Sequence, residues 1–318
     1  MPTPGPGELL VRVHAVGLNP PDWYAREGMP GVPEALKPPV SMPLVPGTDV
    51  SGVVAAVGPD VDDHLLGSEV FGLLNFPVTL QAGAYAEYAV ARVGDVAPKP
   101  AQLAHAHAAA LPMSLLTAWQ FLVELGHGHP SPFQAAPHVP KPLGPGTTVL
   151  VNGAAGGVGH LAVQVAKSCG ARVIAVASGR HEAFLRALGA DQFIDYTVQS
   201  PEDVVRDVDV VLDCVGGPTS RRFLPTLARG GHLYPVYFGE FDDEENARLG
   251  VTVTSTQVRS SGAQLAEVAR LVEDGRLRVA IDSSFALADA RAAHERAAGG
   301  HLQGKIVLRV APGEDAAA

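Results

Sequence analysis

The chain has 318 residues, of which 47% are hydrophobic, and a formal net charge of −10. This length allows two domains, and the apolar content supports buried cores rather than disorder. The net charge, and the lack of a basic cluster longer than Arg221-Arg222, argue against nucleic acid as a partner. No stretch approaches the roughly 20 apolar residues of a membrane span, so we expect no membrane partner and a cytoplasmic location.

Short strand patterns separated by Pro and Gly fill the first third of the chain. Strands are predicted at residues 8–16, 48–57, 69–72 and 84–90. A helix at 264–274 and a strand at 304–308 follow much later and are expected to return to the same domain. Many short strands of this kind predict a β-rich, barrel-like domain made of residues 1–117 and 258–318.

Strand and helix patterns alternate from residue 118 to residue 257. Strands are predicted at 147–151, 171–177, 192–195, 208–213, 231–236 and 251–255. Because this alternation is typical of a doubly wound parallel sheet, we predict a Rossmann domain over 118–257 and an α/β fold class for the whole chain.

A glycine-rich turn joins the first of these strands to a helical pattern that begins near His160. The predicted cofactor-binding residues of this turn are Gly153, Ala154, Ala155, Gly156, Gly157, Val158 and Gly159. Glycines let a backbone turn tightly beside a pyrophosphate, and the following helix N-terminus presents unpaired N–H groups. The sequence therefore predicts a dinucleotide site at this turn.

The end of the second strand of this domain bears on the choice of dinucleotide. NAD sites normally have an acid about 20 residues beyond the glycines, which accepts from the ribose 2′-OH. This chain instead has Ser178 and Arg180, which can hydrogen-bond a 2′-phosphate. We therefore expect NADPH as the cofactor, with Tyr196 flanking the same pocket, although Arg180 could also be a solvated turn residue.

Residues 126–142 are rich in Pro and His and are expected to form a loop. His127, His129 and His138 suggest a metal site, but the loop itself, residues 126–142, contains no Cys or carboxylate. We expect a surface insertion and no bound metal.

Motifs spread over nearly the whole chain carry a resemblance to a known family. They are residues 16–22 (VGLNPPD), 46–49 (PGTD), 83–88 (GAYAEY), 117–120 (TAWQ), 153–159 (GAAGGVG), 188–191 (LGAD) and 304–308 (GKIVL). The chain resembles the zinc-independent medium-chain dehydrogenases/reductases of the NADPH:quinone oxidoreductase (zeta-crystallin-like) type. The resemblance implies a GroES-like catalytic domain, a Rossmann domain and a homodimer.

The resemblance also addresses catalytic zinc. Asn19 and Thr48 stand where zinc-dependent relatives have Cys and His ligands, and Cys169 and Cys214 cannot supply a four-Cys structural site. Without a Lewis acid, alcohol oxidation is disfavoured, whereas an electron-poor quinone can accept hydride without metal polarisation. We expect no metal, and reduction of a small-molecule quinone or enone.

Two catalytic candidates follow from the resemblance. Asn19 is placed near the nicotinamide, where it could donate to a substrate oxygen, and Thr117 approaches the nicotinamide side. Each has a structural alternative, because Asn19-Pro20 is a turn signal and Thr117 could be an ordinary helix residue. Asp22 is expected to order the turn at Asn19 or to cap a helix.

Two departures from the family bear on the function. Several quinone and enoyl-thioester reductases have a Tyr after the glycine that matches Gly28, where this chain has Met29, and the missing Tyr disfavours an enoyl reductase. Relatives usually also have a β-hairpin before the segment that begins this sequence, so a sheet edge could be exposed. An enone or enoyl reductase, or a structural or sensory NADPH-binding protein with little turnover, are the alternatives.

Overall fold

The computed structural model describes residues 1–29, 34, 37, 42–77, 83–129, 138–237 and 239–310. Residues 130–137 of the predicted Pro- and His-rich loop lie outside these ranges. The chain divides into two compact units. Unit 1 consists of Met1–Leu116 and Val258–Ala318, and unit 2 is Thr117–Gln257.

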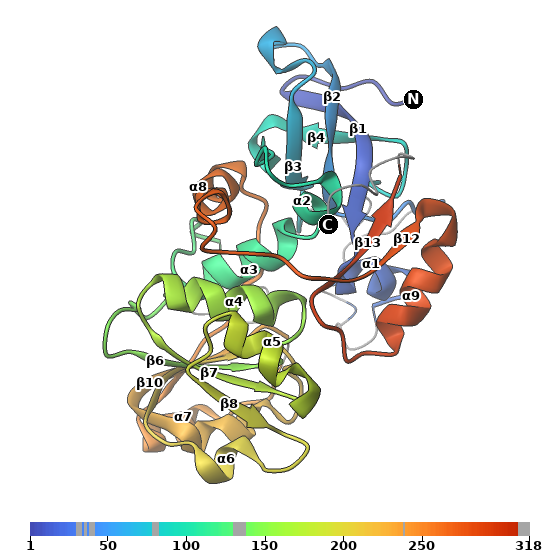
Figure 1. The fold of residues 1–318 in the computed structure, drawn as a ribbon. Coiled ribbons are helices and arrows are strands. Elements are labelled where there is room, and N and C mark those ends of the chain that lie inside the picture. Colours follow the sequence, from blue (N-terminus) through green and yellow to red (C-terminus); the bar gives the residue numbers. More distant parts are fainter. Residues whose placement is uncertain are drawn as a thin grey trace. The chain divides into compact units, whose positions relative to one another are not determined.

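Unit 1 is built on one sheet that combines strands from both ends of the chain. Its order is β12-β13-β1-β2-β3-β5, and β4 also pairs with β1. The strands are β1 (Glu8–Gly17), β2 (Asp49–Val57), β3 (Glu69–Leu73), β4 (Tyr88–Arg92), β5 (Val96–Pro98), β12 (Ile281–Ala286) and β13 (Lys305–Arg309). In Figure 1 the first and last colours of the chain meet where β13 runs beside β1.

Strand β1 is the centre of this sheet because it pairs along its whole length. Residues 8–12 pair with β4 and residues 15–17 pair with β13, while β2 pairs on the other side. The β1–β2 register shifts twice, after Leu10 and after Val13, and such irregularities bend a strand. The sheet edge that the sequence led us to expect therefore does not lie at β1.

Four helices belong to unit 1, and a fifth crosses from one unit into the other. They are α1 (Pro20–Arg26), α2 (His105–Ala109), α8 (Gly262–Glu273), α9 (Ala290–Ala298) and the crossing helix α3 (Pro112–Leu122). Short 3-10 turns lie at Asp63–Leu65, Val93–Asp95 and Leu287–Asp289. The helix predicted at 264–274 is α8, whose Ser261 hydroxyl caps it by accepting from the Gln264 N–H.

The strand predicted at 84–90 begins later, at Tyr88. The backbone N–H groups of Ala84 and Tyr85 donate instead to the carbonyls of Gly47 and Pro46, at 3.2 and 3.0 Å. These residues are thus held against the turn before β2 and cannot join a strand ladder. Alternation in sequence could not reveal this competing partner.

Unit 2 is a six-stranded sheet in which every pair is parallel, in the order β11-β10-β9-β6-β7-β8. This is the doubly wound order, which reverses between β6 and β9. The strands are β6 (Thr148–Asn152), β7 (Arg172–Ala177), β8 (Gln192–Asp195), β9 (Val208–Asp213), β10 (Leu227–Pro235) and β11 (Thr252–Val253). The predicted Rossmann architecture is confirmed.

Helices cover both faces of this sheet. Figure 1 shows α4 (Gly157–Ser168) and α5 (Glu182–Ala187) on one side, and α6 (Pro201–Val204) and α7 (Asp243–Leu249) on the other. Two 3-10 turns, Gly179–His181 and Ser220–Thr226, complete the unit. Because both faces are covered, the strands are almost wholly apolar, and Leu150, Val176 and Val211 are buried together between the layers.

Within the described ranges, no helix combines the length and the apolar character needed to cross a bilayer.

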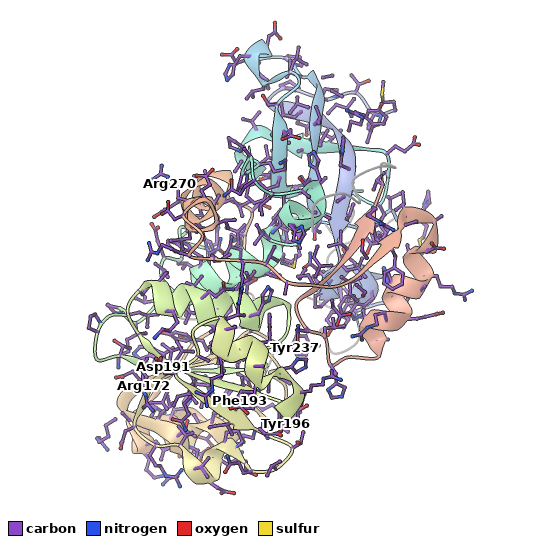
Figure 2. The ribbon with its side chains drawn as sticks, viewed as in Figure 1. Arg172, Asp191, Phe193, Tyr196, Tyr237 and Arg270 are labelled. Atoms are coloured by element: carbon purple, nitrogen blue, oxygen red, sulfur yellow. The ribbon has the colours of Figure 1, made fainter. Side chains whose placement is uncertain are left out.

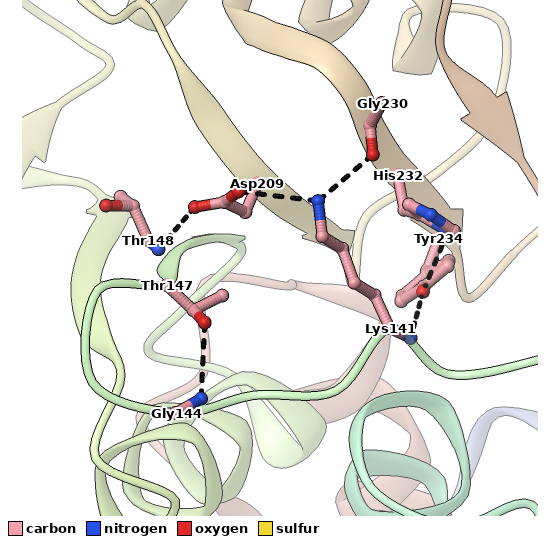
Figure 3. Close-up of polar contacts among 8 residues, drawn as sticks. All are labelled: Lys141, Gly144, Thr147, Thr148, Asp209, Gly230, His232 and Tyr234. Atoms are coloured by element: carbon pink, nitrogen blue, oxygen red, sulfur yellow. Dashed lines mark hydrogen bonds and ion pairs between the residues drawn. The ribbon is translucent and has the colours of Figure 1, made fainter.

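The described C-terminal end of the Pro- and His-rich loop is tied to the sheet by Lys141 (Figure 3). Its ammonium lies 3.3 Å from Asp209 and 3.0 Å from the Gly230 carbonyl, and its backbone N–H donates to the Tyr234 hydroxyl at 2.8 Å. Asp209 also accepts from the Thr148 N–H at 2.9 Å. These bonds fix the entry into β6.

Candidate functional site

The glycine turn follows β6 directly and leads into α4. Gly153 has a φ of +70°, a conformation that glycine adopts without steric cost. The Gly156 N–H donates to the Gly153 carbonyl at 3.0 Å, which closes the turn. Helix α4 begins at Gly157, three residues earlier than the sequence predicted, so Gly157, Val158 and Gly159 form its first turn. No side chain caps this helix, which leaves its first N–H groups directed past the turn.

The glycines of this turn have different roles. A Cβ on Gly159 would lie 2.2 Å from the Gly153 carbonyl oxygen and 2.7 Å from the Cα of Ala154, so Gly159 permits close packing of helix on turn. A Cβ on Gly156 would meet only the Gly153 oxygen, at 3.4 Å, and Gly156 has an ordinary φ of −75°. The space beyond Gly156 is therefore open, as a backbone cradle for a pyrophosphate requires.

A buried carboxylate that the sequence analysis missed organises the neighbouring loop. Asp213 ends β9, is 1% exposed, and accepts from the Asn152 amide at 2.7 Å and the Ser220 hydroxyl at 2.6 Å. It also accepts the backbone N–H groups of Val215 and Gly216, each at 3.0 Å. These bonds hold the loop after β9 beside Gly153, where the strand order reverses and α/β folds bind their ligands. The sequence signal that could have identified Asp213 is its place as an acid at the end of an apolar strand.

The predicted ribose-binding residues lie at the same edge of the sheet. Ser178 follows β7 and is half-buried, Arg180 is exposed, and Tyr196 follows β8 with 40% of its surface exposed (Figure 2). The Arg180 Nε donates to His181 Nε2 at 3.0 Å. Parallel strands thus bring Ser178, Arg180 and Tyr196 to the carboxyl edge that also carries the glycine turn.

An acid from the next strand stands beside this region, although β7 itself ends without one. Asp195 ends β8 opposite Ala177. One oxygen of its carboxylate lies 2.4 Å from the position that a Cβ on Gly179 would take. Hydrogen bonds from the hydroxyl and the backbone N–H of Thr197, and from the Gly179 N–H, lower the pKa of Asp195. The carboxylate is therefore ionised at neutral pH. Sequence spacing missed it because it comes from the next strand.

In unit 1, Asn19 lies in the turn between β1 and α1. It is the N-cap of α1, and its backbone N–H donates to the Asp22 carboxylate at 2.8 Å in a capping box. Asp22 also accepts from the Gly47 N–H at 3.1 Å. The expected ordering of the Asn19 turn by Asp22 is therefore present. Both side chains are buried.

The Asn19 side chain contacts a lysine that the sequence analysis did not single out. Lys305 begins β13 and is 4% exposed. Its ammonium donates to the Leu18 carbonyl at 2.6 Å and to the carboxamide oxygen of Asn19. It also lies 3.8 Å from Asp49, which accepts the Met113 N–H at 2.9 Å. A lysine inside an apolar strand pattern was the signal for this cluster.

The charges of this cluster strongly affect one another. Burial raises the pKa of Asp22 to about 7, opposed by the N–H of Asn19 and reinforced by Asp49. Burial also raises the pKa of Asp49 to about 6, opposed mainly by Lys305. The pKa of Lys305 is lowered by burial, against the attraction of the two carboxylates. Two acids and one base therefore share the site, and near neutral pH one acid holds a proton for part of the time.

The residues present do not fit a catalytic zinc. Zinc needs thiolate, imidazole or carboxylate donors at about 2.0–2.3 Å. Beside Asn19 and Asp49 the resident cation is the Lys305 ammonium, which would repel a second cation in the same space. No group of three or more His, Cys, Asp or Glu in the described ranges is arranged to hold a metal ion.

His138, one of the three histidines of the loop that the structure describes, packs within unit 2. Burial lowers the pKa of His138 to about 4, so the ring is neutral. Its Nε2 donates to the Phe121 carbonyl at 3.0 Å, and its Nδ1 lies 3.0 Å from the Thr254 hydroxyl. Both ring nitrogens are thus engaged within unit 2.

Thr117, the second catalytic candidate, is a residue of helix α3 and is 4% exposed. It opens unit 2, whereas Asn19 belongs to unit 1. Its catalytic role therefore stays a prediction.

Two family models match the chain. Residues 5–101 match the alcohol dehydrogenase GroES-like domain, and residues 188–308 match the zinc-binding dehydrogenase family. The first match covers most of the N-terminal segment of unit 1. The second runs from the Rossmann unit through α8 and α9 to β13.

Relatives and solved structures agree with this assignment. A chloroplast envelope quinone oxidoreductase homolog of Arabidopsis thaliana is 32% identical over 97% of this chain and 91% of its own length. A mitochondrial NAD(P)H oxidoreductase of Mus musculus is 32% identical over 96% and 82%. The quinone oxidoreductase structure from Coxiella burnetii has a TM-score of 0.82 at 32% identity, covering 98% of this chain and 93% of that one. A mycobacterial protein complexed with NADPH has a TM-score of 0.80 at 28% identity, covering 97% and 93%.

The chain therefore belongs to the medium-chain dehydrogenase/reductase family, in which a GroES-like domain accompanies a Rossmann domain. It is an oxidoreductase of that family, with the fold of an enzyme that uses a nicotinamide cofactor.

The two glycines of the turn give a matched test of the cradle. Gly156→Val should lower NADPH affinity by at least about 10-fold with little loss of stability, because its branched side chain enters only the open space. Gly159→Val should instead lower the free energy of unfolding by about 2 kcal/mol or more, because it overlaps backbone atoms. Fluorescence titration with NADPH and denaturant unfolding measure the two effects. Wild-type affinity in Gly156→Val would show that phosphates do not approach the turn there.

Proposed function

We propose that this protein is an NADPH-dependent reductase of quinones and related electron-poor carbonyl or alkene compounds, and that it works without zinc. The observation that carries the proposal is the buried Lys305 ammonium, which donates to Asn19 and lies 3.8 Å from Asp49; the family resemblance sets Asn19 at a zinc-ligand position. The quinone oxidoreductases among its relatives support the substrate class. The proposed binding site is the carboxyl edge of the unit 2 sheet for the cofactor, with Asn19 of unit 1 acting on the substrate.

When bound, the reduced nicotinamide supplies a hydride, and a proton from the medium completes the reduction of quinone to hydroquinone. The chain's own part is to bind, to position and to stabilise charge. The first turn of α4 binds the pyrophosphate through backbone N–H groups, and Asp213 holds the adjoining loop in place. Asn19 donates an N–H to the substrate oxygen that gains negative charge.

The donor that this role requires is the Nδ2 group of Asn19, which carries two hydrogens. One of them is directed at the Gly17 carbonyl at 3.4 Å. The side-chain oxygen accepts from Lys305, and a hydrogen bond from the Asn19 side chain lowers the pKa of Asp49, so in the proposed reaction the substrate oxygen replaces Asp49 as the acceptor. We propose that Thr117 lies beside the nicotinamide, as the family resemblance implies.

The test of this role is turnover. Asn19→Ala should lower quinone turnover by about 10-fold to 100-fold while NADPH affinity stays nearly unchanged, because the lost hydrogen bond strengthens only in the transition state. NADPH absorbance loss over a panel of quinones and enones measures the rate, and fluorescence measures binding. A wild-type rate in Asn19→Ala would reduce Asn19 to a turn residue. Tight NADPH binding without turnover of any compound would favour a structural or sensory role instead.

NADPH preference rests on the balance between Arg180 and Asp195. Arg180→Ala should weaken NADPH binding by about 10-fold or more and leave NADH binding unchanged, because a charge-assisted bond to the 2′-phosphate is lost. Asp195→Asn should strengthen NADPH binding, because a negative charge near the phosphate is removed. Arg172→Ala is the matched control, since Arg172 begins the strand that Arg180 follows and donates to Gln192 at 2.9 Å (Figure 2). Equal affinity of the wild type for NADPH and NADH would contradict the preference.

Zinc independence has a direct test. The purified protein should carry no stoichiometric zinc, and its quinone turnover should survive incubation with a chelator. About one zinc per chain by elemental analysis, with activity lost on chelation, would contradict the proposal.

We also propose a homodimer, formed by pairing of the outer β11 strands. β11 is the last strand in the order of the unit 2 sheet, and such an edge presents unpaired backbone groups. Light scattering at micromolar concentration should give twice the mass of the chain, and a monomer at all concentrations would refute this. A cytoplasmic location stays a prediction, because the relatives include chloroplast and mitochondrial proteins.

A further inference from the structure

The turn after β7 is held at two points, and Arg180 lies between them. The Gly179 N–H donates to the Asp195 carboxylate, and the His181 N–H donates to the Ser178 carbonyl at 3.0 Å. A Cβ on Gly179 would lie 2.4 Å from an oxygen of Asp195, so a side chain at this position would displace the carboxylate. The backbone on both sides of Arg180 is therefore fixed, to β8 on one side and to the end of β7 on the other.

His181 also holds the Arg180 side chain. His181 is only 5% exposed, whereas Arg180 is an exposed residue. The Arg180 Nε donates to His181 Nε2 at 3.0 Å. Because a guanidinium only donates hydrogen bonds, His181 Nε2 is the acceptor, and the neutral ring carries its hydrogen on Nδ1. A buried ring thus fixes one edge of an exposed guanidinium.

The chemistry of this contact suits the recognition of a phosphate. A guanidinium binds phosphate through pairs of parallel N–H groups, and its two Nη atoms carry four of the five hydrogens. His181 accepts the fifth, from Nε. The ring is neutral in this arrangement, so it leaves the positive charge of Arg180 uncompensated, whereas a carboxylate in the same place would cancel it. The contact therefore sets the direction of the guanidinium without weakening its attraction for an anion.

Holding this side chain in place before a ligand binds raises affinity. An arginine side chain has many rotamers, and fixing one of them on binding costs free energy. A guanidinium that is already held by a buried ring avoids part of this cost. NADH lacks the 2′-phosphate, so the gain applies to NADPH alone.

We propose that His181 is a positioning residue of the cofactor site, which orients the Arg180 guanidinium toward the 2′-phosphate and so contributes to the preference for NADPH over NADH. This inference rests on the proposed role of Arg180 in NADPH binding. Because its ring is buried, His181 acts through Arg180 rather than by contact with the phosphate.

Two substitutions of His181 separate the acceptor from the ring. His181→Phe keeps a ring of similar size and removes the acceptor, whereas His181→Gln places a carboxamide near the position of Nε2. His181→Phe should weaken NADPH binding by about 3-fold to 10-fold and leave NADH binding unchanged, and His181→Gln should stay close to the wild type. Fluorescence titration of the full-length protein with each cofactor measures the affinities. Unchanged NADPH affinity in His181→Phe, or equal losses for NADPH and NADH, would overturn the proposal.

His181→Asn is the second variant, in case the apolar ring of His181→Phe disturbs folding. Its carboxamide ends short of the Nε2 position, so NADPH affinity should fall as in His181→Phe while NADH affinity is kept. Competition by adenosine 2′,5′-bisphosphate and by AMP repeats the comparison without the nicotinamide, and only the bisphosphate should bind more weakly. A loss in His181→Gln as large as that in His181→Asn would count against the acceptor role.

A double-mutant cycle shows whether the effect passes through Arg180. Arg180→Ala/His181→Phe should bind NADPH no more weakly than Arg180→Ala, because the guanidinium that His181 holds is already absent. Losses that multiply would overturn the proposal. Wild-type NADPH affinity in Arg180→Ala identifies failure of the proposed function. A weak Arg180→Ala beside a His181→Phe of wild-type affinity identifies failure of the present inference.

Discussion

The ammonium of Lys305, buried beside Asp49 and Asp22, is the interaction on which the organisation of unit 1 depends. Withdrawing such charges from water costs several kcal/mol per ion, and the cost is offset only when the partners lie close together. The cluster therefore requires β13 to dock on β1, with β2 and the start of α3 already beside it. Strand β13 thus brings Lys305 into contact with Leu18 and Asn19, which follow β1.

The cofactor site that we propose in unit 2 depends on different physical features. Its cradle consists mainly of backbone atoms, whose position is set by parallel strands and by the turns that follow them. Because every strand of the sheet runs in the same direction, the glycine turn, Ser178, Tyr196 and the loop after Asp213 all emerge at one edge. Asp213 contributes by accepting hydrogen bonds from two backbone N–H groups of that loop.

Charge is distributed differently over the two sites. In unit 1 the acids and the lysine are buried and compensate one another, so small changes in one group alter the pKa of the others. In unit 2 the ionised groups near the ribose region, Arg180 and Asp195, are solvated and opposite in sign. Solvated charges contribute only modest free energies to binding. Contributions of this size are enough for the proposed preference for NADPH over NADH.

Sequence by itself determined the features that depend on local patterns. The alternation of strand and helix, the glycine turn and the apolar strand runs predicted the Rossmann unit, because these signals come from neighbouring residues. The family motifs located Asn19 and the residues of the cofactor turn. The start of α4 and the limits of β4 and β10 differed from the prediction by a few residues. At β10 the paired glycines 230 and 231 coincide with the break in register.

Only the tertiary structure decided which groups meet across long sequence distances. It set Lys305 against Asn19, Asp195 against Gly179, and Asp213 against the loop after β9. None of these contacts leaves a periodic signal, because each depends on the register between strands that the chain brings together. Sequence thus identified the residues proposed to bind, whereas folding supplied the partners that contact them.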